Sequence, residues 1–346
     1  MNNILFVNPT SGSFDELSLN RVVDRIKEKF NQQVVHHDNA QLINNQKNKL
    51  IIVRTQYADH AKELSSVIDL NNIHIIFIMG GDGIVHEVVN GLYQNRKLKF
   101  HINHNKLILS VIPSGSGNHL SKVLNIKSFE DWIESLYRSA ADPIKLTKVF
   151  PTVVQTAVQT IVQTTVQTAV QTANREILSI NTIVGGLPKG INDTASFISK
   201  YIPKFIGWIK YDISTFVNLF FKKSFRGREA INLICDNDHH INNVIAIFIQ
   251  TTESCGADLI ISRKIKLDQK NISMSYFTDH NVIRILYEFI KEKLGYQSNY
   301  LIRSIDNYQT VCLKGVGNIT IDGQNEQIPL DCTIKRSTEY INFLSN

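Results

Sequence analysis

The sequence predicts a parallel α/β domain followed by a β-rich domain. Up to about residue 140, short apolar stretches alternate with segments of helical periodicity, which is typical of a parallel sheet covered by helices on both faces. After Ile144, strand-like stretches dominate. The length of 346 residues also exceeds that of a typical single domain. We therefore expect an α/β domain over residues 1–142 and a β-rich domain over residues 143–346.

The first domain is expected to alternate strands and helices. After an apolar strand at 4–7, Ser13 is the expected N-cap of the first helix, because Glu16 follows at the spacing of a capping box. Val22 and Ile26 continue that helix with helical spacing. The remaining strands are expected at 50–53, 73–79 and 107–112, and the remaining helices at 58–70, 85–92, 119–123 and 129–137.

The second domain is expected to consist mainly of strands. Within it, residues 152–173 repeat the pattern Thr-x-Val-Gln, which fits an extended chain and also a helix with a slowly drifting Val stripe. We interpret this repeat as a low-complexity insertion in a surface hairpin without a chemical role. Strands are expected at 178–184, 230–235, 244–250, 272–277, 310–313, 319–321 and 330–334, with helices only at 281–294 and in part of 197–222.

Composition and charge describe an ordinary globular protein. Hydrophobic residues make up 43% and charged residues 20% of the chain, which excludes a mostly disordered chain. The 37 Lys and Arg against 31 Asp and Glu give a net charge of +6, which favours anionic partners such as nucleotides or phospholipid surfaces without choosing among them. The N-terminus lacks the basic start of a signal peptide, and the longest charge-free segment, 149–174, carries Gln or Thr throughout. Neither a secretion signal nor a membrane-spanning helix is therefore expected.

Cysteine and histidine patterns point away from a metal site. None of the four cysteines forms a CxxC pair, so we expect reduced, buried thiols in a reducing, cytoplasmic compartment. The pairs His36-His37 and His239-His240 lack acidic or Cys companions at ligand spacing, and solvated loop positions are expected for them. The cysteines are Cys235, Cys255, Cys312 and Cys332.

The strongest chemical signal is the glycine-rich segment from Met79 to Gly91, which follows an apolar strand and opens a helix. Glycines let a ligand approach the backbone, and a helix N-terminus attracts phosphate. In an open parallel sheet, ligands bind at the carboxyl ends of strands. Asp82 in this segment can accept the proton of an attacking hydroxyl, orient a magnesium shell, or only cap the next helix. The glycine spacing differs from that of a Walker loop and of a Rossmann fingerprint.

Two further small-residue turns follow expected strands. They are Asn8-Pro9-Thr10-Ser11-Gly12 after the first strand and Pro113-Ser114-Gly115-Ser116-Gly117-Asn118 after the strand at 107–112. Backbone N–H groups in such turns can cradle anionic oxygens. Each turn is a weak signal alone, but all three should lie along one edge of the same sheet, which indicates a nucleotide site.

These three segments resemble the diacylglycerol-kinase-type catalytic domain, a family that includes diacylglycerol, ceramide and sphingosine kinases. The Gly115–Asn118 turn and the His86–Leu92 stretch are most similar to the sphingosine kinase branch. Segments at 179–187, 225–228, 255–258 and 321–324 resemble later motifs of that branch. The resemblance implies an ATP-dependent lipid kinase with a phosphofructokinase-like N-terminal domain and a C-terminal β-sandwich, which binds ATP, Mg²⁺ and a long-chain lipid.

The resemblance also implies roles for individual residues. Asp82 would be the catalytic base, and Asn192 or its neighbour Asp193 would contact the lipid substrate. Lys204 and Lys210 fall where that branch carries arginines that face the ATP phosphates; lysine keeps the charge but loses the bidentate fork. The other residues expected to line the nucleotide are Asn8, Pro9, Thr10, Thr55, Gly80, Gly81, Gly83, Glu87, Gly115, Ser116, Gly117, Asp322, Gly323 and Gln324.

Three positions depart from the family pattern. Gln324 replaces the Glu of the late Asp-Gly-Glu motif, and Asn192 stands where a sphingosine kinase has an Asp that pairs with the substrate amine. An Asn can accept a hydrogen bond but cannot neutralise an ammonium, which leaves room for a neutral lipid. The family's Asp-Asp-Gly appears here only as 268–271.

Our preferred hypothesis is transfer of the ATP γ-phosphate to a primary hydroxyl of a long-chain lipid, sphingosine first and diacylglycerol or ceramide next. The alternatives are a catalytically weak lipid-binding homologue and a soluble kinase such as an NAD kinase, which shares the Gly-Gly-Asp-Gly turn. The apolar stretch at 205–221 speaks against the soluble kinase. We expect most of it to pack on the second domain and its exposed end, near Lys222 and Lys223, to touch a membrane surface peripherally. No nucleic-acid partner is expected, and the sequence does not give the oligomeric state.

Overall fold

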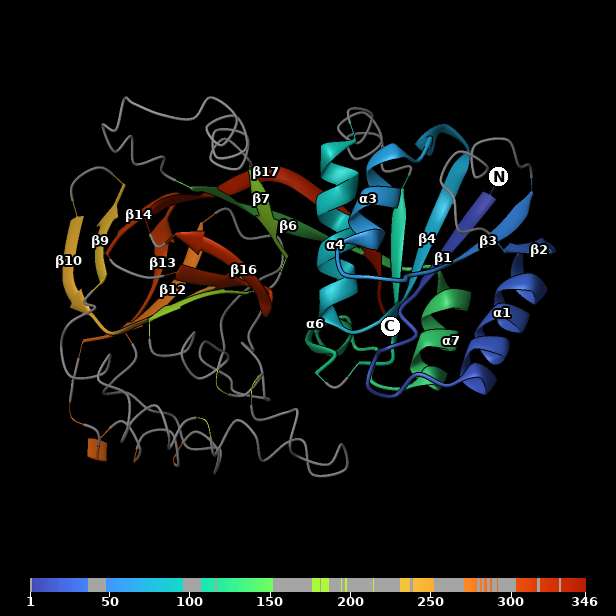
Figure 1. Cartoon of the computed structure of the whole chain (residues 1–346), viewed down its shortest axis with the longest axis horizontal. Coiled ribbons are helices and arrows are strands. Elements are labelled where there is room, and N and C mark those ends of the chain that lie inside the picture. Colours follow the sequence, from blue (N-terminus) through green and yellow to red (C-terminus); the bar gives the residue numbers. More distant parts are fainter. Residues whose placement is uncertain are drawn as a thin grey trace, which may run out of the picture. The chain divides into compact units, whose positions relative to one another are not determined.

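A computed structural model describes most of the first half of the chain and about half of the second (Figure 1). The described residues are 2–36, 48–95, 107–115, 117–151, 176–180, 182–186, 231–236, 239–251, 271–278, 303–315, 318–329 and 331–346, with isolated positions between 194 and 291. The Thr-x-Val-Gln repeat at 152–173 and nearly all of 187–230 lie outside them. Within the described part of the chain, no helix is long and apolar enough to cross a membrane.

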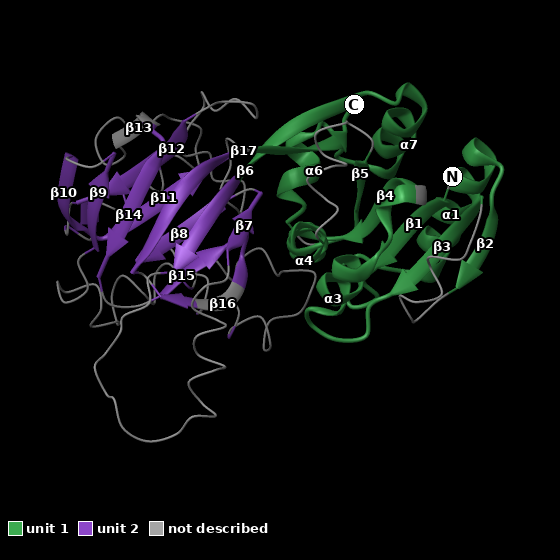
Figure 2. Ribbon diagram, turned by 90° about the horizontal axis from the view of Figure 1, so that it is seen from above, with its two compact units in different colours: residues 1–146, 338–346 green, residues 147–337 purple. Residues whose placement is uncertain are grey.

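The chain forms an α/β unit and a β-sandwich unit, as the sequence predicts (Figure 2). Unit 1 comprises residues 1–146 and 338–346, and unit 2 comprises residues 147–337. Compared with a division at residue 142, unit 1 also includes 143–146 and the C-terminal segment. Two strands continue from one unit into the other, β6 (Ala141–Pro151) and β17 (Cys332–Leu344).

Unit 1 is built on a parallel sheet. Its strand order is β2-β3-β1-β4-β5-β17, and every neighbouring pair in this order is parallel. The central strands are buried along most of their length, which explains why they read as continuous apolar runs in the sequence. The bounds are β1 (Asn2–Val7), β2 (Gln33–His36), β3 (Lys49–Arg54), β4 (Ile73–Gly80) and β5 (Ile108–Pro113).

Helices cover both faces of this sheet (Figure 2). On one face, Phe77 of β4 contacts Phe30 at the end of α1 and Trp132 of α7, with ring centroids 6.3 Å apart in both pairs. The opposite face is covered by α3 and α4, which pack on each other. The helices are α1 (Glu16–Phe30), α3 (His60–Val67), α4 (Asp82–Gln94), α6 (His119–Val123) and α7 (Phe129–Arg138), and a 3₁₀ turn, η1, spans Leu70–Asn72.

The first helix begins later than the sequence predicts. Its N-cap is Asp15, whose carboxylate accepts a hydrogen bond from Ser18 N at 2.8 Å, so the expectation of Ser13 as N-cap was wrong. Ser13 N instead donates to Ser114 O at 2.9 Å. Ser13 therefore belongs to the turn that joins the edge of β1 to that of β5.

Unit 2 is a sandwich of two antiparallel layers. One layer contains β10-β9-β14-β17 together with β6 and β7, and the other has the order β13-β12-β11-β8-β15-β16. Apolar side chains from both layers form one core. The strands are β7 (Ile177–Ser179), β8 (Thr182–Gly186), β9 (Ile231–Cys235), β10 (His239–Val244), β11 (Ala246–Gln250), β12 (Ile272–Phe277), β13 (Arg303–Tyr308), β14 (Thr310–Lys314), β15 (Asn318–Ile321) and β16 (Gln324–Pro329).

Buried cysteines contribute to this core. Cys235 and Cys332 are buried, and Cys312 is half-buried; all three are free thiols. Burial raises the pKa of Cys235 to about 11 and that of Cys332 to about 12. Both thiols are therefore protonated and unreactive near neutral pH. The expectation of reduced, buried cysteines is confirmed for these two, while Cys255 lies outside the described residues.

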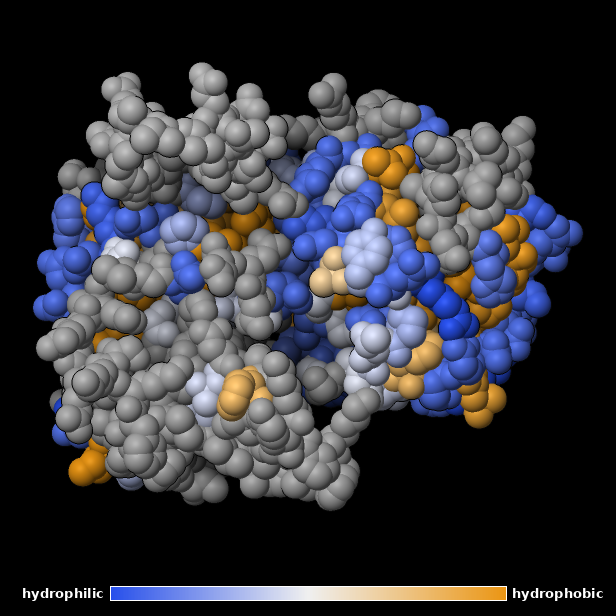
Figure 3. Space-filling view, viewed as in Figure 1, coloured by the Kyte–Doolittle hydropathy of each residue, from blue (hydrophilic) through white to orange (hydrophobic). Residues whose placement is uncertain are grey.

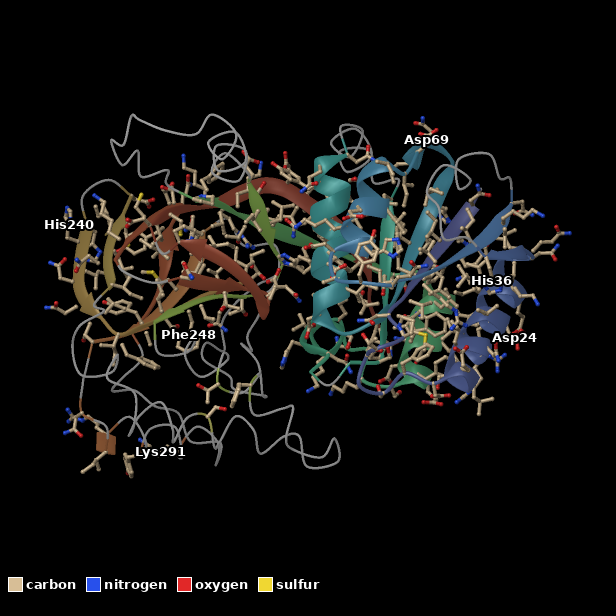
Figure 4. All side chains as sticks on the ribbon, viewed as in Figure 1. Asp24, His36, Asp69, His240, Phe248 and Lys291 are labelled. Atoms are coloured by element: carbon tan, nitrogen blue, oxygen red, sulfur yellow. The ribbon has the colours of Figure 1, made fainter. Side chains whose placement is uncertain are left out.

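The outer surface is polar on the face seen in Figure 3, where hydrophilic residues predominate over hydrophobic ones among the described atoms. Figure 4 labels His36 and His240, which lie on β2 and β10. Both histidines are exposed, as expected, but they lie on strands rather than in loops.

Candidate functional site

The candidate site lies at the carboxyl edge of the unit 1 sheet. The chain passes from β1 toward β2 and β3 on one side, and from β4 toward β5 on the other. The strand order therefore reverses between β1 and β4, which is where open α/β sheets bind ligands. The turns that follow β1, β4 and β5 are the three glycine-bearing segments singled out in the sequence.

Backbone hydrogen bonds lock these three turns together. Asn8 N donates to Met79 O at 3.0 Å, which joins the first turn to the end of β4. Ser114 N donates to Gly80 O at 3.2 Å, which joins the third turn to the second. The expectation that the three segments share one edge is thus met by direct contacts.

Gly81 and Gly115 let two of the turns approach each other closely. A Cβ placed on Gly115 would lie 2.4 Å from the Cα of Gly81, and one placed on Gly81 would lie 3.2 Å from the Cα of Gly115. The obstructing atoms belong to the backbone and cannot rotate away. Any side chain at Gly115 would therefore separate the turn after β4 from the turn after β5.

Asp82 connects α4 to the short helix α6. Its Oδ2 accepts a hydrogen bond from His119 N at 3.1 Å, and its Oδ1 accepts one from Leu120 N at 3.0 Å. The side chain is half-buried. Asp82 therefore does cap a helix, but that helix is α6. In α4 itself Asp82 is the first residue, and Gly81 is the N-cap. Each carboxylate oxygen has a second acceptor position, so this capping does not exhaust the group.

The turn after β5 is held by Asn118. The Oδ1 of Asn118 accepts from Gly115 N, and its Nδ2 donates to Gly115 O, both at 2.8 Å. Asn118 adopts a left-handed conformation with φ of 52° and is the N-cap residue of α6, which an Asn tolerates better than most residues. In the sequence, Asn118 stands out only as the last residue of a Gly-rich motif; in the structure, its two hydrogen bonds to Gly115 shape the turn.

Asn8 and Thr55 directly follow the paired strands β1 and β3 at the carboxyl edge of the sheet. The Oδ1 of Asn8 accepts from both the backbone N and the Oγ1 of Thr10, at 3.0 and 2.7 Å. Thr55 follows β3, and its N–H donates to Val7 O at 2.9 Å. The structure therefore brings Asn8, Thr10 and Thr55 to the same edge as the glycine-rich turn.

Glu87 reaches from α4 to the N-terminus of α3. Its Oε2 accepts a hydrogen bond from Ala61 N at 3.3 Å. The N-cap residue of α3, Asp59, makes no side-chain cap bond, so Glu87 supplies an acceptor to that helix end. Burial raises the pKa of Glu87, and the nearby charge of Asp59 raises it further, while the backbone donors of α3 act in the opposite direction.

Asp322, Gly323 and Gln324 lie in unit 2, in the hairpin that joins β15 to β16. Ile321 pairs with Gln324, which leaves Asp322 and Gly323 as a two-residue turn with φ of 49° and 76°, the Asp-Gly combination typical of such turns. The carboxylate of Asp322 is buried. It accepts from Ser179 Oγ, Ile180 N and Thr182 N at 2.9 to 3.0 Å, and so fastens the connection between β7 and β8.

Several expected site residues lie outside the described part of the chain. They are Ser116, Asn192, Asp193, Lys204 and Lys210. Among the described residues, no group of three His, Cys, Asp or Glu side chains could hold a metal ion alone.

The part of the chain that carries these turns matches a known domain. Residues 2–149 match the diacylglycerol kinase catalytic domain. Over these residues, less than half of the chain, the protein is therefore similar to that domain. The match includes the turns after β1, β4 and β5, together with Asp82 and Glu87.

Curated relatives at the sequence level are sphingoid base kinases. Sphingoid long chain base kinase 5 of Saccharomyces cerevisiae is 41% identical over 71 residues, which cover 20% of this chain and 10% of the yeast protein. Sphingosine kinase 1 of Arabidopsis thaliana is 41% identical over 76 residues, or 22% of this chain and 15% of the plant protein. Human sphingosine kinase 1 is 36% identical over 74 residues, or 21% of this chain and 18% of the human protein. The matched segments thus span less than a fifth of these relatives.

Solved structures support the fold over the whole chain. A putative diacylglycerol kinase from Bacillus anthracis superposes with a TM-score of 0.69 and 15% sequence identity, and the alignment covers 100% of this chain and 97% of that one. A second crystal structure of a putative diacylglycerol kinase from the same organism gives a TM-score of 0.67 at 17% identity. At these identities the likeness concerns the fold alone.

Proposed function

We propose that this protein is an ATP-dependent lipid kinase that phosphorylates a primary hydroxyl of a long-chain lipid. The observation that carries the proposal is the interlocked set of turns after β1, β4 and β5, with the half-buried carboxylate of Asp82 among them. These turns lie at the switch point of a parallel sheet, inside the segment that is similar to the diacylglycerol kinase catalytic domain.

In this proposal Asp82 accepts the proton of the attacking hydroxyl. The N–H groups of His119 and Leu120 orient the carboxylate through one bond to each oxygen, and the remaining acceptor positions are available to a hydroxyl. Asn8, Thr10, Thr55 and the backbone of the glycine turns bind the nucleotide. Phosphoryl transfer needs mainly positioning and charge stabilisation from a protein, which fits a site made largely of backbone.

Mg²⁺ is the expected cofactor, and Asp82 is the carboxylate at this edge that would help to hold it. When bound, the ion neutralises charge on the triphosphate. Lys204 and Lys210 are proposed to contribute positive charge to the same phosphates, and Gly323 and Gln324 are proposed to line the nucleotide. The buried, fully engaged carboxylate of Asp322 favours a supporting role in the turn over direct nucleotide contact.

For the lipid we propose a sphingoid base, with diacylglycerol or ceramide as the alternative. The names of the curated relatives favour the sphingoid base. Asn192 in place of an acidic residue favours a lipid without an amine, unless Asp193 takes that part. Peripheral contact with a membrane, which would supply the lipid, is part of this proposal.

The test is phosphate transfer from ATP onto sphingosine, diacylglycerol and ceramide, compared between the wild-type chain and Asp82→Asn. We expect the variant to lose at least about 100-fold in kcat, the usual contribution of a general base. Glu130→Gln is the matched control, because Glu130 is a carboxylate of the same unit with a side chain 73% exposed, paired to Arg21 at 3.7 Å.

Two outcomes would contradict the proposal. Unchanged transfer in Asp82→Asn would remove Asp82 from the chemistry. Absence of transfer to every lipid, together with clear lipid or nucleotide binding by the wild-type chain, would favour the catalytically weak homologue. Because Asp82 also caps α6, the melting temperature of each variant has to accompany its activity.

A further inference from the structure

The imidazole of His119 lies beside Asp82 and Gly117. A Cβ placed on Gly117 would lie 3.0 Å from His119 Nε2 and 3.5 Å from Asp82 Oδ2. The ring and the carboxylate therefore border the same small space next to the turn after β5. His119 N also donates to Asp82 Oδ2, so the backbone of His119 orients the carboxylate and its ring lies next to that carboxylate.

The two ring nitrogens of His119 have different surroundings. Nδ1 is buried and has no hydrogen-bond partner among the residues that the structure describes. A buried N–H without an acceptor is rarer and costlier than an unused acceptor lone pair. In the neutral ring the proton therefore belongs on Nε2, which makes Nε2–H a donor beside Gly117 and Asp82.

A nucleotide at this edge needs such a donor. The N–H groups of His119 and Leu120, at the start of α6, already donate to Asp82, and Gly115 N donates to Asn118 Oδ1. These backbone donors are engaged within the protein, while the Asp82 carboxylate repels phosphate. A side-chain donor next to Asp82 offsets both effects.

We infer that His119 Nε2–H donates a hydrogen bond to an oxygen of the β- or γ-phosphate of the bound nucleotide. The inference rests on the proposed function, since it assumes that ATP occupies this edge. It assigns to His119 a role in recognising the phosphate tail, distinct from the proton acceptance assigned to Asp82.

The test compares three substitutions of His119 in the full chain. In Gln the side-chain NH₂ reaches the position of Nε2, whereas in Asn it reaches only that of Nδ1; Ala removes both. We expect His119→Ala and His119→Asn to bind Mg·ATP about tenfold more weakly, because a hydrogen bond to a charged group is lost. His119→Gln should stay within about threefold of the wild type, because it keeps the donor.

Calorimetric titration with Mg·ATP and with AMP separates the phosphate tail from the rest of the nucleotide. The loss in His119→Ala should appear for ATP and not for AMP. Lys122→Ala is the control, because Lys122 lies on the same helix with an exposed side chain, and it should bind both nucleotides like the wild type. Equal melting temperatures would show that α6 still folds.

Three results would overturn the inference. One is unchanged ATP binding in His119→Ala, and another is an equal loss for ATP and AMP. The third is a loss in His119→Gln as large as that in His119→Ala. Absence of ATP binding by the wild-type chain would instead refute the proposed function itself, and with it the assumption on which this inference rests.

Discussion

Gly91 provides a stability test whose sign depends on the packing of α3 against α4. In an exposed helix interior, Gly is less stable than Ala by about 1 kcal/mol, so Gly→Ala ordinarily stabilises. Gly91 is buried in α4, and a Cβ there would lie 2.0 Å from Ser65 Oγ and 2.2 Å from Lys62 O of α3. The structure therefore predicts that Gly91→Ala destabilises the protein.

The expected size follows from those two contacts. Overpacking a well-packed interior costs about 1–3 kcal/mol, and the upper end applies because Lys62 O is a backbone atom that moves only with the whole helix. After subtracting about 1 kcal/mol of gained helix propensity, the net loss is about 2 kcal/mol. With a urea m-value of about 2 kcal/mol/M, the midpoint should fall by about 1 M.

The assay is urea unfolding followed by tryptophan fluorescence. The chain has two tryptophans, Trp132 and Trp208, so a Trp208→Phe background leaves Trp132 as the reporter. Trp132 is fully buried and contacts Phe77 of β4, and it therefore reports on unit 1. Adding Ser65→Ala should restore only part of the loss, because Lys62 O remains in place. An unchanged or raised midpoint in Gly91→Ala would refute the reasoning.

Two further predictions concern the buried carboxylate of Asp322 and the half-buried one of Glu87. Asp322→Ala should lower the unfolding free energy by about 3 kcal/mol, because it removes an acceptor shared by Ser179, Ile180 and Thr182; urea unfolding followed by circular dichroism measures this. Asp331→Ala, which among the described residues removes one bond, to Gly315 N at 3.2 Å, is the control, and equal losses would contradict the prediction. For Glu87, burial raises the pKa above 4.5 in the folded state, so the folded protein binds the carboxyl proton more tightly than the unfolded chain does. The stability that this proton contributes is therefore lost as the pH rises from 4.5 through the folded-state pKa. The unfolding free energy of the wild type minus that of Glu87→Gln should therefore decrease from pH 4.5 to about 7. A difference that stays flat or rises over this range would show that burial does not raise the pKa of Glu87.

The strands of unit 1 could be predicted well wherever burial dominates. β1, β3, β4 and β5 coincide with the expected apolar runs to within two residues, because a central parallel strand is buried on both faces and needs apolar side chains throughout. β2 was missed. None of its residues is fully buried, and the polar residues Gln33 and His36 at its two ends are exposed, so the sequence shows no continuous apolar run. β6, β10, β13 and β16 were missed for a similar reason, since each carries several polar residues.

Local sequence could predict where the candidate site lies but not how it is connected. Three turns after three strands indicated a shared edge, and the structure joins them there. The partners of Asp82 lie 37 and 38 residues away along the chain, a distance over which no spacing rule operates. The same limit explains why His119 was not singled out: its importance depends on Gly117 and Asp82 lying beside its ring.

The two acidic residues of α4 show why a catalytic-looking motif does not by itself establish catalysis. Asp82 accepts from the first N–H groups of α6, and Glu87 accepts from the first turn of α3, so one helix supplies the caps of two others. A carboxylate near helix N-termini is stabilising on its own account, and both residues would be retained by a protein that only needed this edge to stay folded. A structural cap and a proton acceptor differ in what their amide analogues do. Asp82→Asn keeps one acceptor oxygen for α6 but is no longer a base, so a loss of transfer far larger than the loss of stability is the result that separates chemistry from capping.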